Sequence, residues 1–550
     1  MPFEKYTAFK PIDIEDRQWP SKVLDQAPRW CSVDLRDGNQ ALIDPMTVEE
    51  KLQMWELLLS IGFAEIEVGF PAASQPDFDF IRRIIEEDRI PDGVSVQILC
   101  QAREELIQRS VEALEGAKSV IFHLYNSTSE LQRRVVFGMD RQGIIDLAVS
   151  GTEIVKQGLA GFSGHAAFEY SPESFTGTEL DFAAEICTAV ADTWGASEED
   201  PMIINLPSTV EMSTPNIYAD QIEWFCRYFE RRKHAVISLH THNDRGTGVA
   251  ATELGLMAGA QRVEGTLFGN GERTGNCDLV TMAMNLFSQG VDPMLDLRAM
   301  PDIRKTVEAV NKLAVHERHP YAGDLVFTAF SGSHQDAIKK GMAQVDRSHW
   351  EVPYLPIDPE DVGGSYKETV RVNSQSGKGG VGFLLEEHFG LTLPRDLLVE
   401  FSGCVQQLTE ELDREVKPDE IYQALLTTYA VNDEPYQLLS YDLLAGKEQD
   451  QRCIARVCVA DNTLTIDGEG SGPLEAFVNA MVETLNEPLV IAGYQEQSMG
   501  SGSDAQAICI LSIEGDDQGR CFGIGLSRNT MTASLNAIIS AMNRRWAADR

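Results

Sequence analysis

Ser238-Leu239-His240-Thr241-His242-Asn243-Asp244 is the stretch on which the fold prediction rests, and it follows the apolar run Ala235-Val236-Ile237. An apolar run that ends in polar residues is typical of a buried strand. Side chains at i and i+2 of a strand lie on the same face, roughly 6.5 to 7 Å apart. His240 and His242 therefore point to one side, where two imidazoles form half of a metal site. The alternative is that backbone carbonyls satisfy both histidines.

Strands and helices alternate on both sides of this stretch. Predicted strands lie at residues 30–35, 64–69, 94–100, 119–125, 164–170, 202–206, 235–242 and 262–268, and a predicted helix follows each. Thr47 and Glu50 form a capping-box pattern at the start of the first helix. This alternation requires a parallel sheet, and eight units in roughly 260 residues match a (β/α)8 TIM barrel. A doubly wound open sheet is the rival arrangement.

The side chains best suited to chemistry all follow predicted strands. They are Asp37, Glu173, Thr209, His240, His242 and Asn276. In a (β/α)8 barrel these positions share the C-terminal rim, which is the face where active sites are built. The shared rim favours the barrel over the open sheet.

The length of the chain, 550 residues, predicts two or three domains. We predict a catalytic barrel with its N-terminal lead at 1–300, helical linker subdomains at 301–435 and a regulatory domain at 436–550. Residues 472–480 and 529–537 resemble each other in pattern and position, which indicates a duplicated α/β module in the last domain. Such a module after an enzyme domain often senses a ligand, although its helices could also be plain packing elements.

Composition excludes several classes of protein. A net charge of −39 argues against a nucleic-acid or membrane-surface binder, because both partners are anionic; it could also reflect a salt-rich habitat. No apolar run approaches the roughly 18 to 20 residues that cross a bilayer, and the N-terminus has no secretory pattern. The ten cysteines include no CxxC pair, so we expect a reducing cytoplasm.

A metal site with open coordination positions follows from strand order. The strands before Asp37, His242 and Asn276 become neighbours when a barrel closes, so a carboxylate, two imidazoles and an amide oxygen can meet. Three or four protein ligands leave room for a substrate, which is the catalytic arrangement. Mg²⁺, Mn²⁺ and Zn²⁺ all remain compatible with this donor set. The alternative for Asp37 is a turn or helix-cap role.

Two further features lie at the same rim. Arg36 precedes Asp37, and its guanidinium could stabilise an oxyanion or clamp a carboxylate; the alternative is a surface arginine in an ion pair. The stretch Gly269-Asn-Gly-Glu-Arg-Thr-Gly-Asn276 is not a dinucleotide fingerprint, because its glycines are wrongly spaced and it follows the last strand. A tight loop that shapes the metal site is the better interpretation.

These motifs resemble those of a known family. Leu35-Arg-Asp-Gly-Asn-Gln40, His240-Thr-His-Asn-Asp244 and the loop ending at Asn276 are similar to the signatures of metal-dependent acyl-CoA Claisen condensing barrels. The narrowing motifs are Phe168-Glu-Tyr-Ser-Pro-Glu173, Asn205-Leu-Pro-Ser-Thr-Val-Glu-Met212, Ser331-Gly-Ser-His-Gln-Asp336 and Val372-Asn-Ser-Gln-Ser-Gly-Lys-Gly-Gly380. Together they resemble the 2-isopropylmalate synthase family, in its longer subtype with a C-terminal leucine-sensing domain. The resemblance covers nearly the whole chain and weakens after residue 435.

The resemblance implies an acyltransferase of leucine biosynthesis. It implies condensation of acetyl-CoA with 3-methyl-2-oxobutanoate, followed by thioester hydrolysis to 2-isopropylmalate. Asp37, His240 and His242 match the metal ligands of the family, and Asn276 completes or supports the site. The implied cofactor is Mg²⁺, with Mn²⁺ or Zn²⁺ as alternatives and K⁺ as a possible activator.

The resemblance also implies roles for other side chains. Arg36 would share the alkoxide charge, and the positions that match substrate contacts are His123, Ser171 and Thr209. Glu173, His334 and Tyr354 match the residues that remove a methyl proton from acetyl-CoA and activate the hydrolytic water, work suited to a carboxylate–imidazole pair. His334 lies outside the barrel, so either the same subunit or the partner of a homodimer could supply it. The alternative is that His334 has no catalytic role.

Regulation and rival functions complete the prediction. Family analogy places L-leucine at a dimer contact near Tyr494 and Asp504. The rivals are a sister condensing enzyme, such as homocitrate or citramalate synthase, and a barrel lyase of the 3-hydroxy-3-methylglutaryl-CoA lyase type. A homocitrate-forming enzyme needs a cation or hydroxyls for a second carboxylate, which the sequence does not identify. A non-catalytic amino-acid sensor is the remaining alternative.

Overall fold

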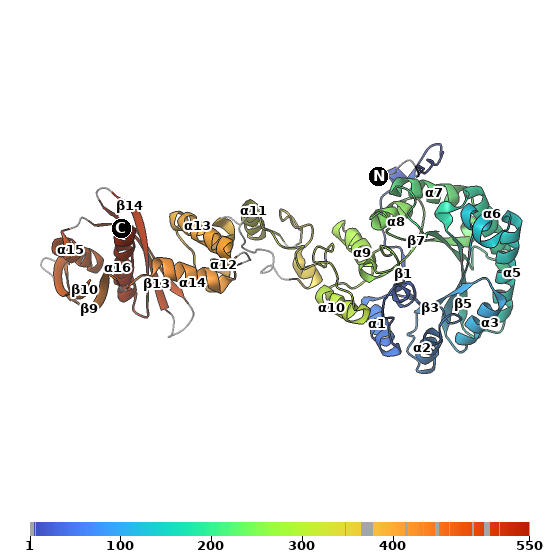
Figure 1. Ribbon diagram of the computed structural model, residues 1–550, viewed down its shortest axis with the longest axis horizontal. Helices are drawn as coiled ribbons and strands as arrows, with labels where there is room; N and C mark the ends of the chain where they lie inside the picture. Colours follow the sequence, from blue (N-terminus) through green and yellow to red (C-terminus); the bar gives the residue numbers. More distant parts are fainter. Residues whose placement is uncertain are drawn as a thin grey trace. The chain divides into compact units, whose positions relative to one another are not determined.

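The computed structural model describes Lys5 and residues 7–346, 348–364, 378–412, 416–432, 434–445, 450–460, 462–486, 489–499, 506–515 and 518–548. Contacts divide the chain into two compact units (Figure 1). The first unit consists of Met1–Val326 with Pro359–Gly364, and the second of Phe327–Asp358 with Ser365–Arg550. The finer division into domains at residues 300 and 435 stays a prediction.

Eight parallel strands form a closed barrel in the first unit, and β8 returns to pair with β1. The strands are β1 (Arg29–Ser32), β2 (Glu65–Gly69), β3 (Ser95–Gln101), β4 (Ser119–Ser127), β5 (His165–Glu173), β6 (Met202–Ser208), β7 (Ala235–Thr241) and β8 (Arg262–Gly265). The closed order confirms the predicted (β/α)8 barrel and excludes the open doubly wound sheet.

Helices surround this barrel (Figure 1). They are α1 (Val48–Ile61), α2 (Gln75–Glu86), α3 (Glu104–Ala113), α4 (Glu130–Gln132), α5 (Arg141–Leu159), α6 (Leu180–Trp194), α7 (Pro215–Tyr228), α8 (Gly248–Met257) and α9 (Leu279–Ser288). A further helix, α10 (Met300–Asn311), follows the barrel and packs on α1. None of the helices within the described ranges is long and apolar enough to cross a bilayer.

The first barrel helix begins where the sequence predicts. The Thr47 hydroxyl accepts a hydrogen bond from the Glu50 amide at 3.2 Å, and the Glu50 carboxylate accepts one from the Thr47 amide at 2.7 Å. This reciprocal capping satisfies two amide groups that have no partner inside the helix. Gly62 ends α1 with a φ of 105°, a left-handed conformation that residues with a side chain rarely adopt.

Strand β5 is longer than the sequence predicts. We expected it to end at residue 170, whereas it continues to Glu173 and stays paired with β4, where Ser127 faces Glu173. On its other side β5 pairs with β6 only at Glu169 and Tyr170. Pro172, which has no amide hydrogen, therefore lies where that neighbour makes no ladder hydrogen bond. Ser171 and Glu173 are consequently strand residues rather than loop residues.

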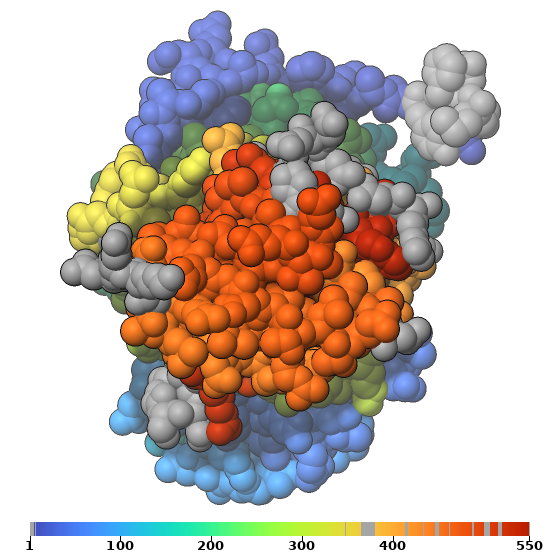
Figure 2. All heavy atoms as spheres, turned by 90° about the vertical axis from the view of Figure 1, so that its left-hand side faces the viewer, coloured from blue at the N-terminus to red at the C-terminus, as the bar shows by residue number. Residues whose placement is uncertain are grey.

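The second unit combines helices with two small sheets. Its helices are α11 (Gly332–Met342), α12 (Lys378–Phe389), α13 (Arg395–Leu412), α14 (Pro418–Tyr429), α15 (Pro473–Leu485) and α16 (Thr530–Ala548). Its strands are β9 (Tyr436–Ala445), β10 (Gln451–Val459), β11 (Asn462–Gly470), β12 (Val490–Met499), β13 (Gln506–Gly515) and β14 (Gln518–Ser527). Strands β9 and β12 were not predicted from the sequence. The orange atoms that face the viewer in Figure 2 belong to this unit, seen from the side on which Figure 1 labels β9, β10 and α15.

The two halves of this strand-rich domain repeat one design. Each has three antiparallel strands, in the orders β11-β10-β9 and β12-β13-β14, and each is followed by a helix. A Cβ added to Gly468 would lie 2.5 Å from both the Ala476 carbonyl oxygen and the Ala480 amide nitrogen. Gly525 stands in the same relation to the second helix, α16. The predicted duplication is therefore confirmed at the level of individual contacts.

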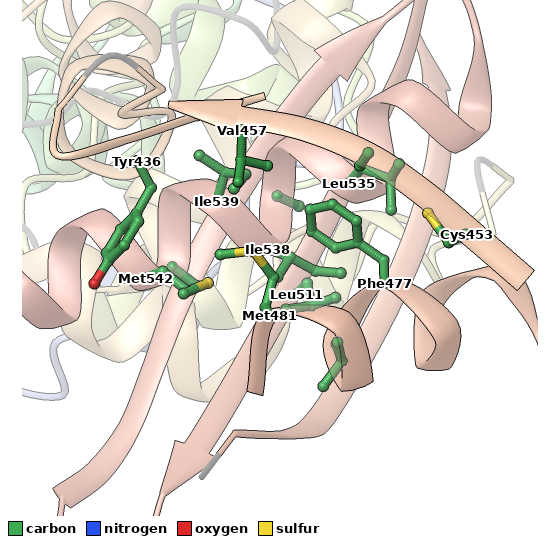
Figure 3. Packing of buried hydrophobic residues seen from close by; sticks show 14 of the residues in the cluster. Tyr436, Cys453, Val457, Phe477, Met481, Leu511, Leu535, Ile538, Ile539 and Met542 are labelled. Atoms are coloured by element: carbon green, nitrogen blue, oxygen red, sulfur yellow. The ribbon is translucent and has the colours of Figure 1, made fainter. Parts of the chain in front are cut away.

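The core of the duplicated domain is shared by both halves. Figure 3 shows side chains from the strands and from α15 and α16 that point toward one another, among them Val457, Phe477, Leu511 and Ile538. All four are fully buried. Burial of apolar surface against both helices holds the two sheets in one domain.

We expect Gly525→Ala to destabilise the second unit by about 3 kcal/mol, because the new methyl group would overlap packed backbone. Its Cβ would lie 2.0 Å from the Ala533 carbonyl oxygen. Urea denaturation of the full chain measures the change. Gly403→Ala in α13 is the matched control, since its methyl group meets nothing within 4 Å, and we expect it to gain about 0.5–1 kcal/mol. Equal stability of the two variants would contradict the close sheet–helix contact.

Candidate active site and metal centre

A cavity of about 650 Å³ lies at the C-terminal ends of the barrel strands. Its lining contains most of the predicted site residues: Arg36, Asp37, His123, Ser171, Glu173, Thr209, His240 and His242. These side chains come from β1, β4, β5, β6 and β7 or from the turns directly after them. The barrel therefore gathers residues that are more than 200 positions apart in sequence.

Asp37, His240 and His242 form a compact group of potential metal ligands. One ligand atom from each lies within 4.8 Å of the others, and all three residues are buried. His240 Nε2 is 3.3 Å from Asp37 Oδ2, and His242 Nε2 is 3.8 Å from the same oxygen. Asp37 lies in the π-helical turn Asp34–Gly38 that follows β1. Closure of the barrel at β1 and β8 brings this turn beside the end of β7.

The polar atoms of this group are not satisfied by the protein. Within the described part of the chain, Asp37 Oδ2, His242 Nδ1 and Asn276 Oδ1 are buried and have no hydrogen-bond partner. Each such atom costs about 1–3 kcal/mol unless something binds it. A divalent cation would remove this cost, because carboxylate, imidazole and amide oxygen are suitable ligands. The residues present therefore fit a metal ion.

Asn276 is held beside the histidine pair by a tight loop. Its backbone forms an isolated bridge with His242, and its Nδ2 donates to the Asn270 carbonyl oxygen at 3.1 Å. A Cβ on Gly271 would lie only 2.3 Å from Asn276 Nδ2, so the glycine makes room for this amide. The side-chain oxygen remains available as a ligand.

Arg36 is nearly buried and paired, which excludes the alternative of a surface arginine. Its side chain is 10% exposed and donates to Asp37 Oδ1 at 2.7 Å and to the Glu67 carboxylate. Burial opposes its charge, but Asp37 and Glu67 raise the pKa of Arg36 above its ordinary value. A permanent positive charge therefore faces the cavity next to the metal ligands.

The charges in the metal group favour different protonation states for the two histidines. Burial alone would lower the pKa of His240, but the neighbouring carboxylates of Asp37 and Glu264 raise it to about 9. Burial and the neighbouring His240 lower the pKa of His242 to about 4. Burial alone would raise the pKa of Asp37, but Arg36 and the histidines lower it. Because a metal ligand must be deprotonated, binding of a cation is coupled to proton release.

The predicted substrate contacts line the same cavity, on β4 and β5 and directly after β6. His123 Nε2 is 2.8 Å from Ser171 Oγ, and His123 Nδ1 is 3.1 Å from the Glu67 carboxylate. Thr209 Oγ1 accepts a hydrogen bond from the Ser174 amide at 2.9 Å. Glu173 accepts a hydrogen bond from the Ser127 hydroxyl, which fixes its carboxylate at the end of β5. Hydroxyl, imidazole and carboxylate groups therefore line one continuous surface.

Other predicted residues belong to the second unit. The rings of His334 and Tyr354 stack with centroids 3.9 Å apart, and Tyr354 is 60% exposed. The Tyr494 hydroxyl contacts Glu496 at 2.8 Å and Ser534 at 3.1 Å. Asp504 lies outside the described residues, as does the segment 372–377 of one narrowing motif.

The sequence analysis missed a buried layer of polar residues beneath the cavity. It contains Glu67, Gln97, Glu169, Asn205, Arg262 and Glu264. The available signal was the presence of charged residues inside strands that are otherwise buried, as in β2 and β8. Buried charges of this kind need partners, and Arg262 binds both Glu65 and Glu264, whereas neither carboxylate oxygen of Glu169 has a hydrogen-bond partner among the described residues.

Comparisons with known proteins agree with this architecture along the chain. Residues 27–307 match the HMGL-like family. Residues 324–386 match the family described as alpha-isopropylmalate synthase, post-catalytic domain-like. Residues 415–546 match the LeuA allosteric (dimerisation) domain.

Three relatives that match this chain over nearly its whole length are all named 2-isopropylmalate synthase. The 2-isopropylmalate synthase of Rhodospirillum rubrum is 54% identical over 551 residues, which cover 98% of each protein. The enzyme of the same name from Parafrankia is 53% identical over 99% of this chain and 98% of its own length. The one from Clostridium acetobutylicum is 50% identical over 99% of both chains. By this near-complete match and by its three family domains, the chain belongs to the 2-isopropylmalate synthase family.

Proposed function

We propose that the chain condenses acetyl-CoA with 3-methyl-2-oxobutanoate and hydrolyses the thioester, giving 2-isopropylmalate and free CoA. The observation that carries this proposal is the group Asp37, His240 and His242, in which Asp37 Oδ2 and His242 Nδ1 have no hydrogen-bond partner among the described residues and which lies beside Arg36 and Glu173 in one cavity. The same cavity thus offers ligands for a cation, a fixed positive charge and a carboxylate base. Each serves one need of a Claisen condensation: polarisation of the carbonyl, stabilisation of the developing charge and removal of the methyl proton.

Asp37, His240 and His242 would hold the divalent cation, with Asn276 as a further ligand. Mg²⁺ is our first choice, with Mn²⁺ and Zn²⁺ compatible with the donors. When bound, the cation supplies Lewis-acid polarisation of the keto carbonyl. The buried guanidinium of Arg36 stabilises the negative charge that develops on the carbonyl oxygen as the new bond forms. His123, Ser171 and Thr209 orient the keto acid through hydrogen bonds.

Glu173 is the proposed base for the acetyl group. Its carboxylate takes a proton from the methyl carbon of acetyl-CoA, and the resulting carbanion attacks the keto carbon. The alkoxide so formed takes up a proton, and a water molecule then cleaves the thioester to release the CoA thiol. His334 and Tyr354 are the proposed partners in activating this water, supplied by the same subunit or by the partner of a homodimer.

The cavity lining favours a small branched keto acid. Phe70, Leu99 and Pro207 provide apolar surface for an isopropyl group. Among the lining residues that the structure describes, the arginines are Arg36 and Arg273, and Arg273 is paired with Asp244 at 2.6 Å. A second substrate carboxylate, as in 2-oxoglutarate, would find no spare cation there, which argues against a homocitrate-forming enzyme.

We expect thiol release from acetyl-CoA to be fastest with 3-methyl-2-oxobutanoate in a panel of 2-keto acids. The preference in kcat/KM over pyruvate and glyoxylate should be at least about tenfold, because each buried methyl group contributes to binding. Spectrophotometric detection of free thiol measures all substrates. A chelator-treated sample is the control for metal dependence. Preference for 2-oxoglutarate, pyruvate or glyoxylate would overturn the substrate assignment, and absence of turnover with every keto acid would favour a sensor.

The proposal extends to assembly and regulation. The match to an allosteric dimerisation domain supports a homodimer that responds to L-leucine, with Tyr494 and Asp504 as candidate pocket residues. All ten cysteines are free, which supports a reducing cytoplasmic setting. Activation by K⁺ belongs to the same proposal.

A further inference from the structure

The buried polar layer beneath the cavity converges on Glu264 in β8. Its Oε1 accepts hydrogen bonds from Gln97 Nε2 at 2.7 Å and from Arg262 Nη1 at 3.0 Å. Its Oε2 accepts from His240 Nδ1 at 2.8 Å and from Asn205 Nδ2 at 3.1 Å. An ionised carboxylate has about four acceptor positions, so all of them are used. Glu264 is fully buried and cannot exchange these partners for water.

The register of the barrel explains this convergence. His240 and Glu264 are direct partners in the pairing of β7 with β8. Arg262 lies two residues before Glu264, on the same face of β8, and it also binds Glu65 at 2.6 Å. Arg262 and Gln97 therefore anchor the Glu264 carboxylate at Oε1, on the side away from the imidazole.

This contact decides which nitrogen of His240 is available to a cation. With Nδ1 hydrogen-bonded to Glu264, Nε2 faces Asp37, 3.3 Å from Oδ2, and is the nitrogen left to bind a cation. The hydrogen bond on one imidazole nitrogen sets the tautomer and the ring orientation at the other. His242 differs, because its Nδ1 is buried and has no hydrogen-bond partner among the described residues. Of the two imidazoles, His240 is therefore the one that a carboxylate fixes through Nδ1.

The same carboxylate reaches the predicted keto-acid contacts. Asn205 Nδ2 donates to Glu264 and also to Ser171 Oγ at 3.1 Å. Ser171 in turn is 2.8 Å from His123 Nε2. A displacement of Glu264 would therefore be felt both at the metal group and at the predicted keto-acid contacts.

A second cation site is a weaker interpretation of this layer. Glu67, His123 and Glu264 have ligand atoms within 4.8 Å of one another. However, Gln97 Nε2 donates to both carboxylates, at 2.8 Å and 2.7 Å, and lies 3.3 Å from His123 Nδ1. The amide nitrogen already occupies the position between the three groups. The layer is therefore a support for the cavity rather than a metal site of its own.

We propose that Glu264 is a positioning residue, which fixes His240 so that Nε2 binds the catalytic cation and which ties this imidazole through Asn205 to the keto-acid contacts. The inference rests on the metal site of the proposed function. It assigns to Glu264 a role in cation affinity and in substrate orientation, without contact to either ligand.

Glu264→Gln tests this role with almost no change in volume. A glutamine side chain places an NH₂ group where two donors now point, so one side of the layer loses its hydrogen bonds. We expect the dissociation constant for Mn²⁺, measured with the metal alone by electron paramagnetic resonance, to rise 10- to 100-fold. The KM for the keto acid should rise as well, and the nitrogen-15 shifts of His240 should show a mixture of tautomers.

Glu65→Gln is the matched control. It removes another buried carboxylate that binds Arg262, but Glu65 does not contact His240. We expect it to lower thermal stability while Mn²⁺ affinity and the His240 tautomer stay unchanged. Loss of Mn²⁺ affinity in Glu65→Gln equal to that in Glu264→Gln would overturn the proposal, because general loosening of the barrel would then explain both.

Two further variants separate this inference from the proposed function. If Glu264→Gln binds Mn²⁺ as tightly as the parent while Asp37→Asn loses it, the positioning role is overturned and the metal site stands. If Asp37→Asn also binds Mn²⁺ like the parent, the metal site itself fails. Should Glu264→Gln not fold, Glu264→Asp takes its place: it keeps the charge but withdraws the carboxylate from His240, and unchanged Mn²⁺ affinity in that variant would equally overturn the role.

Discussion

Replacement of His242 by alanine is expected to abolish turnover and to weaken cation binding. His242 is one of three buried side chains whose potential ligand atoms lie within 4.8 Å of one another, and Asp37 Oδ2 beside it has no hydrogen-bond partner in the described part of the chain. Losing an imidazole ligand removes Lewis-acid stabilisation worth several kcal/mol, so kcat should fall by at least about 1000-fold. Steady-state thiol release together with Mn²⁺ binding measures both effects.

His165→Ala provides the control for this experiment. His165 is an exposed histidine at the first residue of β5, at the end of the strand remote from the cavity rim. We expect the parental rate and the parental Mn²⁺ affinity in this variant. Normal activity in His242→Ala would remove the histidine pair from the mechanism.

Glu173→Gln is the second large effect that we expect. The amide keeps the volume of the side chain and can still accept a hydrogen bond from Ser127, but it cannot take a proton from the acetyl methyl group. Loss of a general base reduces kcat by about 100- to 10 000-fold. Binding of Mn²⁺ should stay at the parental value, because Glu173 is not part of the ligand group. Exchange of the acetyl methyl protons with deuterated water, followed by NMR, would locate the loss in the deprotonation step.

Glu86→Gln is the matched control for the base. Glu86 is an exposed residue of α2 that pairs with Arg82 and is not part of the cavity lining. Its replacement should change kcat by less than about threefold, in line with the small effects of exposed polar substitutions. A parental exchange rate in Glu173→Gln would assign the base to another residue, with His334 the first candidate.

The architecture of the barrel could be predicted because each strand–helix unit carries its own local signal. Apolar runs such as Ala235-Val-Ile237 and the capping pattern at Thr47 define elements without reference to the rest of the chain. Strand β12 has no such signal. Its residues are exposed or half-buried along its length, and Gln495 and Gln497 donate to the Thr392 carbonyl oxygen, more than 100 residues away. The propensity of such a strand depends on tertiary partners.

The candidate site likewise contains residues that could be predicted from the sequence and one residue that could not. The i, i+2 spacing of His240 and His242 predicts that they share a face, and the structure places Asp37 within reach of both. Glu264 could not be recognised, because its role depends on the register between β7 and β8. The predicted end of β5 was also too early, because Pro172 suggests that the strand breaks there. Since β6 does not pair with β5 at this position, the proline leaves no ladder hydrogen bond unmade and the strand continues. Local chemistry is readable in a sequence, whereas register is a property of the assembled sheet.

Closure of the barrel between its first and last strands has a consequence during synthesis of the chain. Asp37 emerges from the ribosome long before His240, and Asn276 follows β8. A nascent chain that stops before the eighth strand therefore cannot hold Asp37 beside the two histidines, however much secondary structure it has formed. Because domains fold as units during translation, catalytic competence should arise in one step, when β8 seals the sheet. Two fragments cut within the barrel would regain the centre only by complementing each other.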